Sequence, residues 1–195
     1  IPTQPMPFFV RPIARALCRG VHATLRDKKG FLWIATSNGL NRFDGYSFKT
    51  FLQIPGDSTS IGDNVVNALA EDSKGFLWVG TGNGLYRYDP LTERFSGSFL
   101  PKTIDSSGFD VKQMYLDSEE CLWMGSSYTI GLLQYDTRSG RFDRFVNHAA
   151  HKFGGGNLIN EVCKDKNNLI MLRTIYARLN MQEKWSEVDK AIKNG

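Results

Sequence analysis

Residues 72–89 read DSKGFLWVGTGNGLYRYD, and almost the same phrase, DKKGFLWIATSNGLNRFD, occupies residues 27–44. A third copy begins DSEECLWMGS at residue 117, so that Trp33, Trp78 and Trp123 lie 45 positions apart. A repeat of this length, made of strand-forming residues, is typical of β-propellers, in which each repeat is one four-stranded sheet called a blade. The sequence therefore predicts an all-β fold of successive blades.

The second copy shows how one repeat forms one blade. Residues 64–72, NVVNALAED, are an apolar and β-branched run that ends at an acidic turn. In residues 76–81, FLWVGT, both alternating faces are largely apolar, which indicates a strand buried between neighbouring sheets. Residues 85–89 and 94–99 supply the third and fourth strands. By the same pattern, blades are expected at about 21–52, 64–100 and 110–146.

The turns of the repeat have a structural explanation. Asp27, Asp72 and Asp117 each open a tight reversal, in which the carboxylate can accept hydrogen bonds from the backbone ahead of it. One carboxylate per turn is too few for a calcium site. The glycine-rich stretch 82–84 is interpreted as a hairpin and not as a phosphate cradle, because no helix follows it. We therefore expect no cofactor and no metal.

A fourth copy, DKNNLIMLRT at residues 165–174, has Met171 where tryptophan is expected. With a last unit at about 158–180, the chain holds about three and a half blades, an incomplete ring, within a propeller-repeat domain at 17–180. Residues 1–16 are predicted to be a Pro-rich arm, because proline is poorly tolerated inside a central strand. Residues 181–195 are predicted to form a short amphipathic helix, because apolar residues recur there at helical spacing. These are Met181, Trp185, Val188 and Ile192.

Composition excludes several kinds of partner. The chain has 195 residues with 24 Lys and Arg against 20 Asp and Glu, and the basic residues are scattered, so no nucleic-acid surface is predicted. The three cysteines have no metal-ligand spacing, and Cys121, at the position of Phe31 and Phe76, is expected to be a small buried apolar residue. No apolar run is long enough to span a bilayer, so no membrane contact is expected from these residues. The chain opens on Ile and not Met, so we expect a processed or trimmed piece.

No catalytic set stands out in the sequence. His22 falls in a predicted inner strand, where a hydrogen-bonded core histidine is expected. His148 and His151 fall in a long loop, without a nucleophile or a pair of carboxylates at a fixed offset. The sequence therefore predicts a protein that is not an enzyme.

The pattern D-x-x-G-F-L-W-[IV]-[AG]-T-x-N-G-L-x-R-[FY]-D resembles the two-component regulator propeller repeat. The resemblance covers residues 21–146 well and 158–174 weakly. It implies the periplasmic sensor region of Bacteroides-type hybrid histidine kinases, a family in which many members detect oligosaccharides. The expected function is thus a non-catalytic ligand-sensing propeller fragment of a two-component signal transduction sensor, on the periplasmic or extracellular side of the inner membrane.

The predicted ligand site lies on one rim of the propeller. In this fold the connections between blades and the loops that follow the Trp strands lie on the same side. The candidate ligand contacts on this rim are Asn38, Asn83, Tyr128 and His151. Tyr128 belongs to a loop that is longer than in the other copies, and insertions in repeat arrays often map to the working face.

Two other functions are compatible with the repeat. These are a propeller-fold lyase or hydrolase acting on polysaccharide, and a protein–protein assembly scaffold. An incomplete ring would leave apolar blade faces exposed. We therefore expect either a second copy that completes the ring, or an arm and a helix that cover the ends.

Overall fold

The computed structural model describes residues 20–97, 99, 110–126, 132–145, 161–164 and 170–173. The first blade is an antiparallel sheet of β1 (Val21–Arg26), β2 (Leu32–Thr36), β3 (Gly39–Phe43) and β4 (Phe48–Phe51), paired in chain order. The second blade repeats it with β5 (Val66–Glu71), β6 (Leu77–Thr81), β7 (Gly84–Asp89) and β8 (Arg94–Ser96).

The third blade consists of β9 (Gln113–Leu116), β10 (Cys121–Gly125), β11 (Leu132–Asp136) and β12 (Phe142–Phe145) in the same order. Two further strands, β13 (Glu161–Lys164) and β14 (Ile170–Arg173), pair antiparallel at the fourth copy of the repeat. All regular elements in the described part of the chain are thus strands, and each of the first three repeats forms one four-stranded sheet. The predicted propeller blades are confirmed. The predicted arm at 1–16 and the predicted helix at 181–195 lie outside the described residues.

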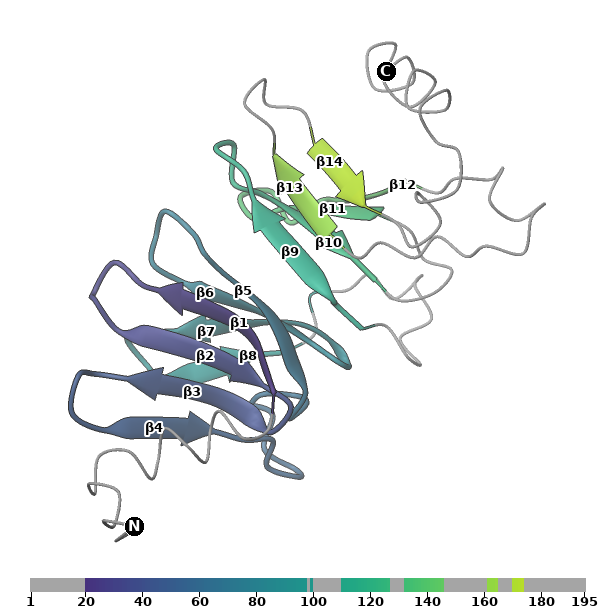
Figure 1. Ribbon diagram of the computed structural model, residues 1–195. Coiled ribbons are helices and arrows are strands. Elements are labelled where there is room, and N and C mark those ends of the chain that lie inside the picture. The colour runs from purple at the N-terminus through teal and green to yellow at the C-terminus, as the bar shows by residue number, and fades with distance from the viewer. Residues whose placement is uncertain are drawn as a thin grey trace, which may run out of the picture.

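The first strand of each repeat lies beside the first strand of the next. β1 packs against β5, β5 against β9, and β9 against β13 (Figure 1). This arrangement places the four inner strands next to one another. The β2–β3 hairpin of the first blade and the β6–β7 hairpin of the second therefore lie at the same end of the array.

Each tryptophan of the repeat is bonded to the aspartate six positions before it, a contact that we call the Asp–Trp pair. In the second blade one oxygen of Asp72 accepts the backbone N–H of Phe76 at 2.9 Å, and the other accepts the indole N–H of Trp78 at 3.0 Å. The first and third blades repeat both bonds from Asp27 and Asp117. Because one carboxylate serves both the turn and the Trp strand, the six-residue spacing is a requirement of the hydrogen bonding.

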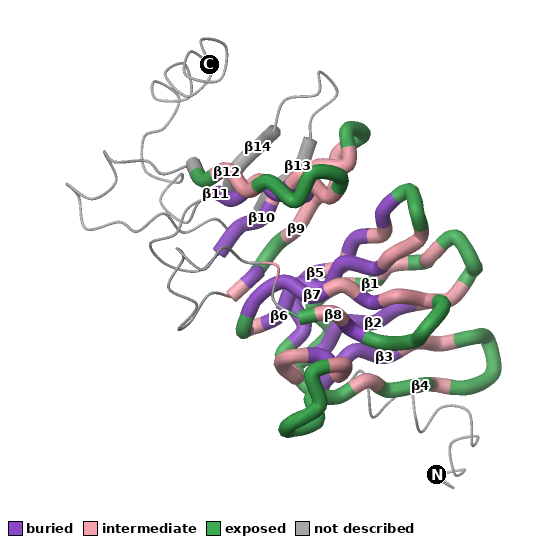
Figure 2. The backbone as a smooth tube through the Cα atoms, turned by 180° about the vertical axis from the view of Figure 1, so that it is seen from behind, coloured by how far each residue is buried: buried purple, intermediate pink, exposed green. Residues whose placement is uncertain are grey.

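The core consists of the layers between blades. Trp33 packs edge-on against Tyr88 of the second blade, with ring centroids 5.0 Å apart, and Trp78 packs in the same way against Tyr135 of the third blade at 5.4 Å. Trp33 and Trp78 are each 1% exposed, whereas Trp123 is only half-buried. Figure 2 shows that burial is concentrated in the strands of the second blade, which has a neighbour on both sides.

The turns between the first and second strands also join neighbouring blades. The carboxylate of Glu71 accepts the backbone N–H of Lys28 at 2.9 Å, and that of Glu120 accepts the N–H of Ser73 at 3.2 Å. Glu120 has a φ of 65°, at the position where the other two turns have Gly30 and Gly75. A left-handed conformation is unfavourable for a residue with a Cβ. The third blade thus keeps a strained residue whose side chain reaches the second blade.

Glu93 of the second blade forms ion pairs with the first blade, and their contribution to the stability of the protein can be tested. Its carboxylate pairs with Lys49 and, at 2.9 Å, with Arg42. The hydrogen bond from Lys49, followed by that from Arg42, lowers the pKa of Glu93. Because the folded-state pKa is below the unfolded value of about 4.3, the stabilisation is present above that value and is lost as the pH falls through the folded pKa.

We expect Glu93→Gln to lower the free energy of unfolding at pH 7 by less than about 1 kcal/mol, because the carboxylate is partly exposed to solvent. The difference from the unmodified protein should shrink in urea titrations carried out below about pH 4. Glu119→Gln, at an exposed turn position, is the matched control. An effect of Glu93→Gln that did not change between pH 7 and pH 3 would contradict this assignment.

Candidate functional site

The first part of the predicted rim is the hairpin between β2 and β3. The hydroxyl of Thr36 donates to the carbonyl of Gly39 at 2.8 Å and accepts the backbone N–H of Asn38 at 3.1 Å. The N–H of Gly39 in turn donates to the carbonyl of Asn64, at the start of the second blade. These bonds fix the hairpin and leave the side chain of Asn38 exposed.

The second blade repeats this hairpin between β6 and β7. Thr81 donates to the carbonyl of Gly84 at 3.0 Å and accepts the N–H of Asn83 at 3.1 Å, so the predicted hairpin at 82–84 is confirmed. Asn83 is exposed, and its carbonyl accepts the hydroxyl of Tyr86 at 3.4 Å. Burial, followed by the charge of Asp63, raises the pKa of Tyr86, so this hydroxyl stays protonated and remains a donor.

The structure therefore places Asn38 and Asn83 on corresponding hairpins of adjacent blades, at the same end of the array. The other two candidates, Tyr128 and His151, lie outside the described residues. The two asparagines are presented by rigid hairpins and not by long loops. Two side-chain amides at fixed positions can donate to and accept from a polar ligand.

His22 differs from its expected place in the core. It lies in β1 but is exposed, and it is hydrogen-bonded through both ring nitrogens. Its Nδ1 is 2.8 Å from the carbonyl oxygen of Val66, and its Nε2 is 3.0 Å from the hydroxyl of Ser37. The cause is a register shift between Val21 and Ala23, which makes His22 the extra residue of a β-bulge.

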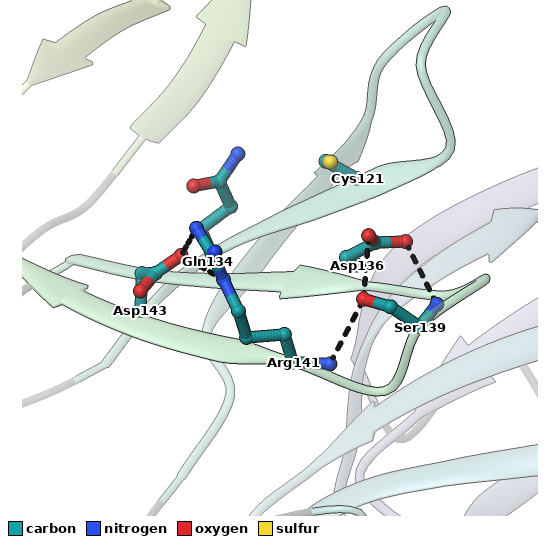
Figure 3. A pocket seen from close by; sticks show the side chains of 6 residues that line it. All are labelled: Cys121, Gln134, Asp136, Ser139, Arg141 and Asp143. Atoms are coloured by element: carbon teal, nitrogen blue, oxygen red, sulfur yellow. Dashed lines mark hydrogen bonds and ion pairs between the residues drawn. The ribbon is translucent and has the colours of Figure 1, made fainter.

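A pocket of about 440 Å³ lies in the third blade, at the end of the blades opposite the predicted rim (Figure 3). It is formed where β10 begins, where β11 ends, and along the turn that leads into β12. Its lining is polar apart from one thiol. The lining residues are Cys121, Gln134, Asp136, Ser139, Arg141 and Asp143.

The pocket exists because two large side chains of the repeat are replaced in the third blade. In the first blade the guanidinium of Arg42 lies 4.7 Å from the ring centre of Phe31, and in the second that of Arg87 lies 4.4 Å from that of Phe76. The third blade has Cys121 in place of the phenylalanine and Gln134 in place of the arginine, as the strand register shows. Smaller side chains at both positions leave the space open.

The groups of the pocket are held in place mainly by one another. Asp136 accepts the hydroxyl of Ser139 at 2.6 Å, and this bond, followed by backbone N–H groups of the turn, lowers the pKa of Asp136. Arg141 pairs with Asp143 at 2.8 Å. Part of the hydrogen-bonding capacity of the lining residues is therefore already taken up by bonds within the turn.

The expectation that Cys121 is a buried apolar residue is wrong, because the thiol is half-buried at the edge of the pocket. Burial, followed by the charge of Asp117, raises its pKa, so it is a poor nucleophile at neutral pH. Phe31 and Phe76 are also only half-buried at the equivalent position. This position lies at the start of the second strand of each sheet, which accounts for its partial exposure in all three blades.

Within the described ranges, His, Cys, Asp and Glu side chains form no group of three that could hold a metal ion. In the same part of the chain, no helix has the length and the apolar character needed to cross a membrane.

Sequence reasoning missed the pocket and the contact between His22 and Ser37. Comparing the copies position by position could have indicated both, because Gln134 replaces an arginine and His22 stands where the second blade has Asn67. The pocket and the two rim asparagines lie at opposite ends of the blades. They are therefore two separate candidate sites.

The repeated four-stranded sheets, the Asp–Trp pairs and the aligned inner strands define the chain as a β-propeller repeat protein. Residues 60–83 match the family model described as two component regulator propeller. Residues 60–83 thus carry a two-component regulator propeller repeat, as the resemblance in the sequence indicated.

A short segment also matches a curated protein. Over 36 residues the chain is 56% identical to "Histidine kinase P4" of Formosa agariphila, which corresponds to 18% of this chain and 3% of that protein. The chain therefore covers only a small part of this relative.

Solved structures share the fold. Two crystal structures of one extracellular domain from B. thetaiotaomicron, described as a one component system and as a hybrid two component system, align with TM-scores of 0.62 and 0.60. Their identities are 22% and 23%, over 79% and 78% of this chain and 20% of theirs. Virginiamycin B lyase from Staphylococcus aureus aligns with a TM-score of 0.58 at 16% identity, over 78% of this chain and 48% of the lyase. At these identities the likeness concerns the fold alone.

Proposed function

We propose that this chain is the ligand-sensing part of an extracytoplasmic two-component sensor and that its ligand is an oligosaccharide. The observation that carries the proposal is the match of residues 60–83 to the two-component regulator propeller family. The extracellular domains that share the fold support a location on the periplasmic or extracellular side of the inner membrane. Signalling by phosphotransfer would then belong to other parts of a longer protein.

The rim is the proposed binding surface, with Asn38 and Asn83 as contacts and with Tyr128 and His151 as further predicted contacts. Sugar hydroxyls both donate and accept hydrogen bonds, and a side-chain amide offers two donors and one acceptor oxygen. The hairpins of Asn38 and Asn83 are fixed by the hydroxyls of Thr36 and Thr81. Little conformational entropy would therefore be lost when a ligand binds there.

Calorimetric titration with a panel of neutral and acidic oligosaccharides tests this proposal. We expect heat with at least one member, and we expect Asn38→Ala and Asn83→Ala each to weaken binding by roughly 2-fold to 10-fold, the loss of about one net hydrogen bond. Ser118→Ala, in an exposed turn at the opposite end of the third blade, is the control and should leave binding unchanged. No heat with any member would contradict the proposal.

A second copy of the chain is the proposed partner, because Trp33 and Trp78 are buried against the next blade whereas Trp123 of the third blade is half-buried. Light scattering in solution is expected to give a mass of two chains. A mass of one compact chain would contradict the pairing and would leave the ligand proposal untouched.

A further inference from the structure

We propose that Ser37 is an activated nucleophile, with His22 as its general base, and that it accepts acyl groups from carboxylic esters. This activity is separate from ligand sensing. The proposal rests on the hydrogen bonds and the exposure of His22 in β1 and Ser37 in the β2–β3 hairpin, and on how the second blade differs at these two positions.

The hydrogen bonds of His22 determine which ring nitrogen carries the proton. The carbonyl oxygen of Val66 can only accept, so the ring nitrogen 2.8 Å away, Nδ1, carries the hydrogen. In the neutral imidazole, Nε2 is then an acceptor, and the Ser37 hydroxyl 3.0 Å away donates to it. A serine that donates to a histidine, which is itself oriented by a third group, is the arrangement that activates a nucleophile.

The pair is not needed to form the blade. The second blade has Asn67 and Gly82 at the equivalent positions and forms the same bulge and the same hairpin register. Both hairpins are fixed by their threonine hydroxyls, as shown above. Asn67 is buried, and its side-chain nitrogen has no hydrogen-bond partner among the described residues. The exposed pair of Ser37 and His22 therefore has no counterpart in the second blade.

Ser37 and His22 are both open to a substrate. Both residues are exposed, and a Cβ built on Gly20 would lie 3.6 Å from the Ser37 oxygen and 3.7 Å from Nε2 of His22. Because Gly20 has no side chain, the Ser37 oxygen and Nε2 of His22 stay accessible on this side.

The proposed reaction is a balanced acyl transfer. The Ser37 oxygen bonds to the ester carbonyl carbon while its proton passes to Nε2 of His22, and the resulting tetrahedral species breaks the carbon–oxygen bond of the ester. His22 returns the proton to the departing alcohol. Water, deprotonated by His22, then hydrolyses the acyl-serine and restores the pair.

Labelling with an alkyl fluorophosphonate, read by intact mass and peptide mapping, tests the proposal. Ser37 is expected to react at least about 100-fold faster than Ser47 and Ser139, since a general base contributes about 10²–10⁴-fold. Those two exposed serines donate to carboxylates and not to a histidine, so they are internal controls. The unmodified protein should also release p-nitrophenol from p-nitrophenyl acetate.

Three variants make the test specific. His22→Asn and Ser37→Gly reproduce the second blade, so both should fold with an unchanged melting temperature. His22→Asn should reduce labelling of Ser37 to the level of the control serines, and Ser37→Gly should abolish labelling at this position. Gly20→Asn should also slow labelling by covering the pair on this side, because asparagine tolerates the φ of 75° found there. Labelling of Ser37 no faster than of Ser47, or unchanged in His22→Asn, would overturn the proposal.

Discussion

Replacing Trp78 with alanine is expected to lower the free energy of unfolding by about 3–5 kcal/mol, the usual cost of removing a large buried aromatic side chain. The indole is 1% exposed and packs edge-on against Phe99 at 5.0 Å and Tyr135 at 5.4 Å. Its loss would open a cavity between the second and third blades. Urea denaturation followed by circular dichroism measures the effect.

Two further variants keep this prediction open to refutation if Trp78→Ala does not fold. Trp78→Phe keeps most of the packing but removes the N–H that Asp72 accepts, so about 1–3 kcal/mol should be lost. Trp123→Ala, at a half-buried position, should cost less than Trp78→Ala. Equal losses for Trp78→Ala and Trp123→Ala would show that burial between blades is not the cause.

Replacing Asp72 with alanine is expected to lower the free energy of unfolding by about 2–5 kcal/mol. The carboxylate is 3% exposed, and without it the N–H groups of Phe76 and Trp78 lose their acceptor. Each buried donor left without a partner costs about 1–3 kcal/mol. Denaturant titration gives the loss, and the indole proton signal of Trp78 in NMR spectra should move when its acceptor is removed.

Asp117→Ala is the matched control, because Asp117 makes the same two bonds in a half-buried turn where water can replace it. Its effect should be smaller than that of Asp72→Ala. Asp72→Asn should also be milder, because the amide oxygen can still accept one of the two bonds. If Asp72→Ala unfolded at the same urea concentration as the unmodified protein, the Asp–Trp pair would have no role in stability.

The sequence predicted the blades well because the same physical requirement is repeated in each copy. A strand buried on both faces needs apolar residues or hydrogen-bonded polar ones on both faces, and 77–81 of the second blade is buried throughout. The spacing from Asp72 to Trp78 is visible in the sequence, although its cause, the hydrogen bond between the two side chains, is visible only in the structure. The side chain of Met171 has no N–H group, so the fourth copy cannot make that side-chain bond.

The sequence did not predict features that depend on local deviations from the repeat. The bulge at His22 comes from a shift in strand register. It turns the His22 side chain, which was expected in the core, toward Ser37. Cys121 was expected to be buried because phenylalanine stands there in the other copies, but the position lies at the start of β10, where the side chain is only half-buried. Glu120 stands where the other copies have glycine, and its carboxylate bonds across to Ser73, a contact that spans 47 positions of the chain.

The two candidate sites call for different ligands. The rim presents side-chain amides on rigid hairpins, whereas the pocket of the third blade contains carboxylates that are already bonded to Ser139 and Arg141. Because they lie at opposite ends of the blades, a ligand at one site would not contact the other. Measurements that show at which end of the blades a ligand binds therefore distinguish the two sites.

The most direct test of the proposed sensing rim is an NMR titration of ¹⁵N-labelled protein with oligosaccharides from the panel. The side-chain amide signals of Asn38 and Asn83 are expected to shift in a saturable way, while that of Gln134, in the pocket, stays in place. Shifts confined to Gln134, or no shift at the two asparagines with any saccharide, would contradict the account.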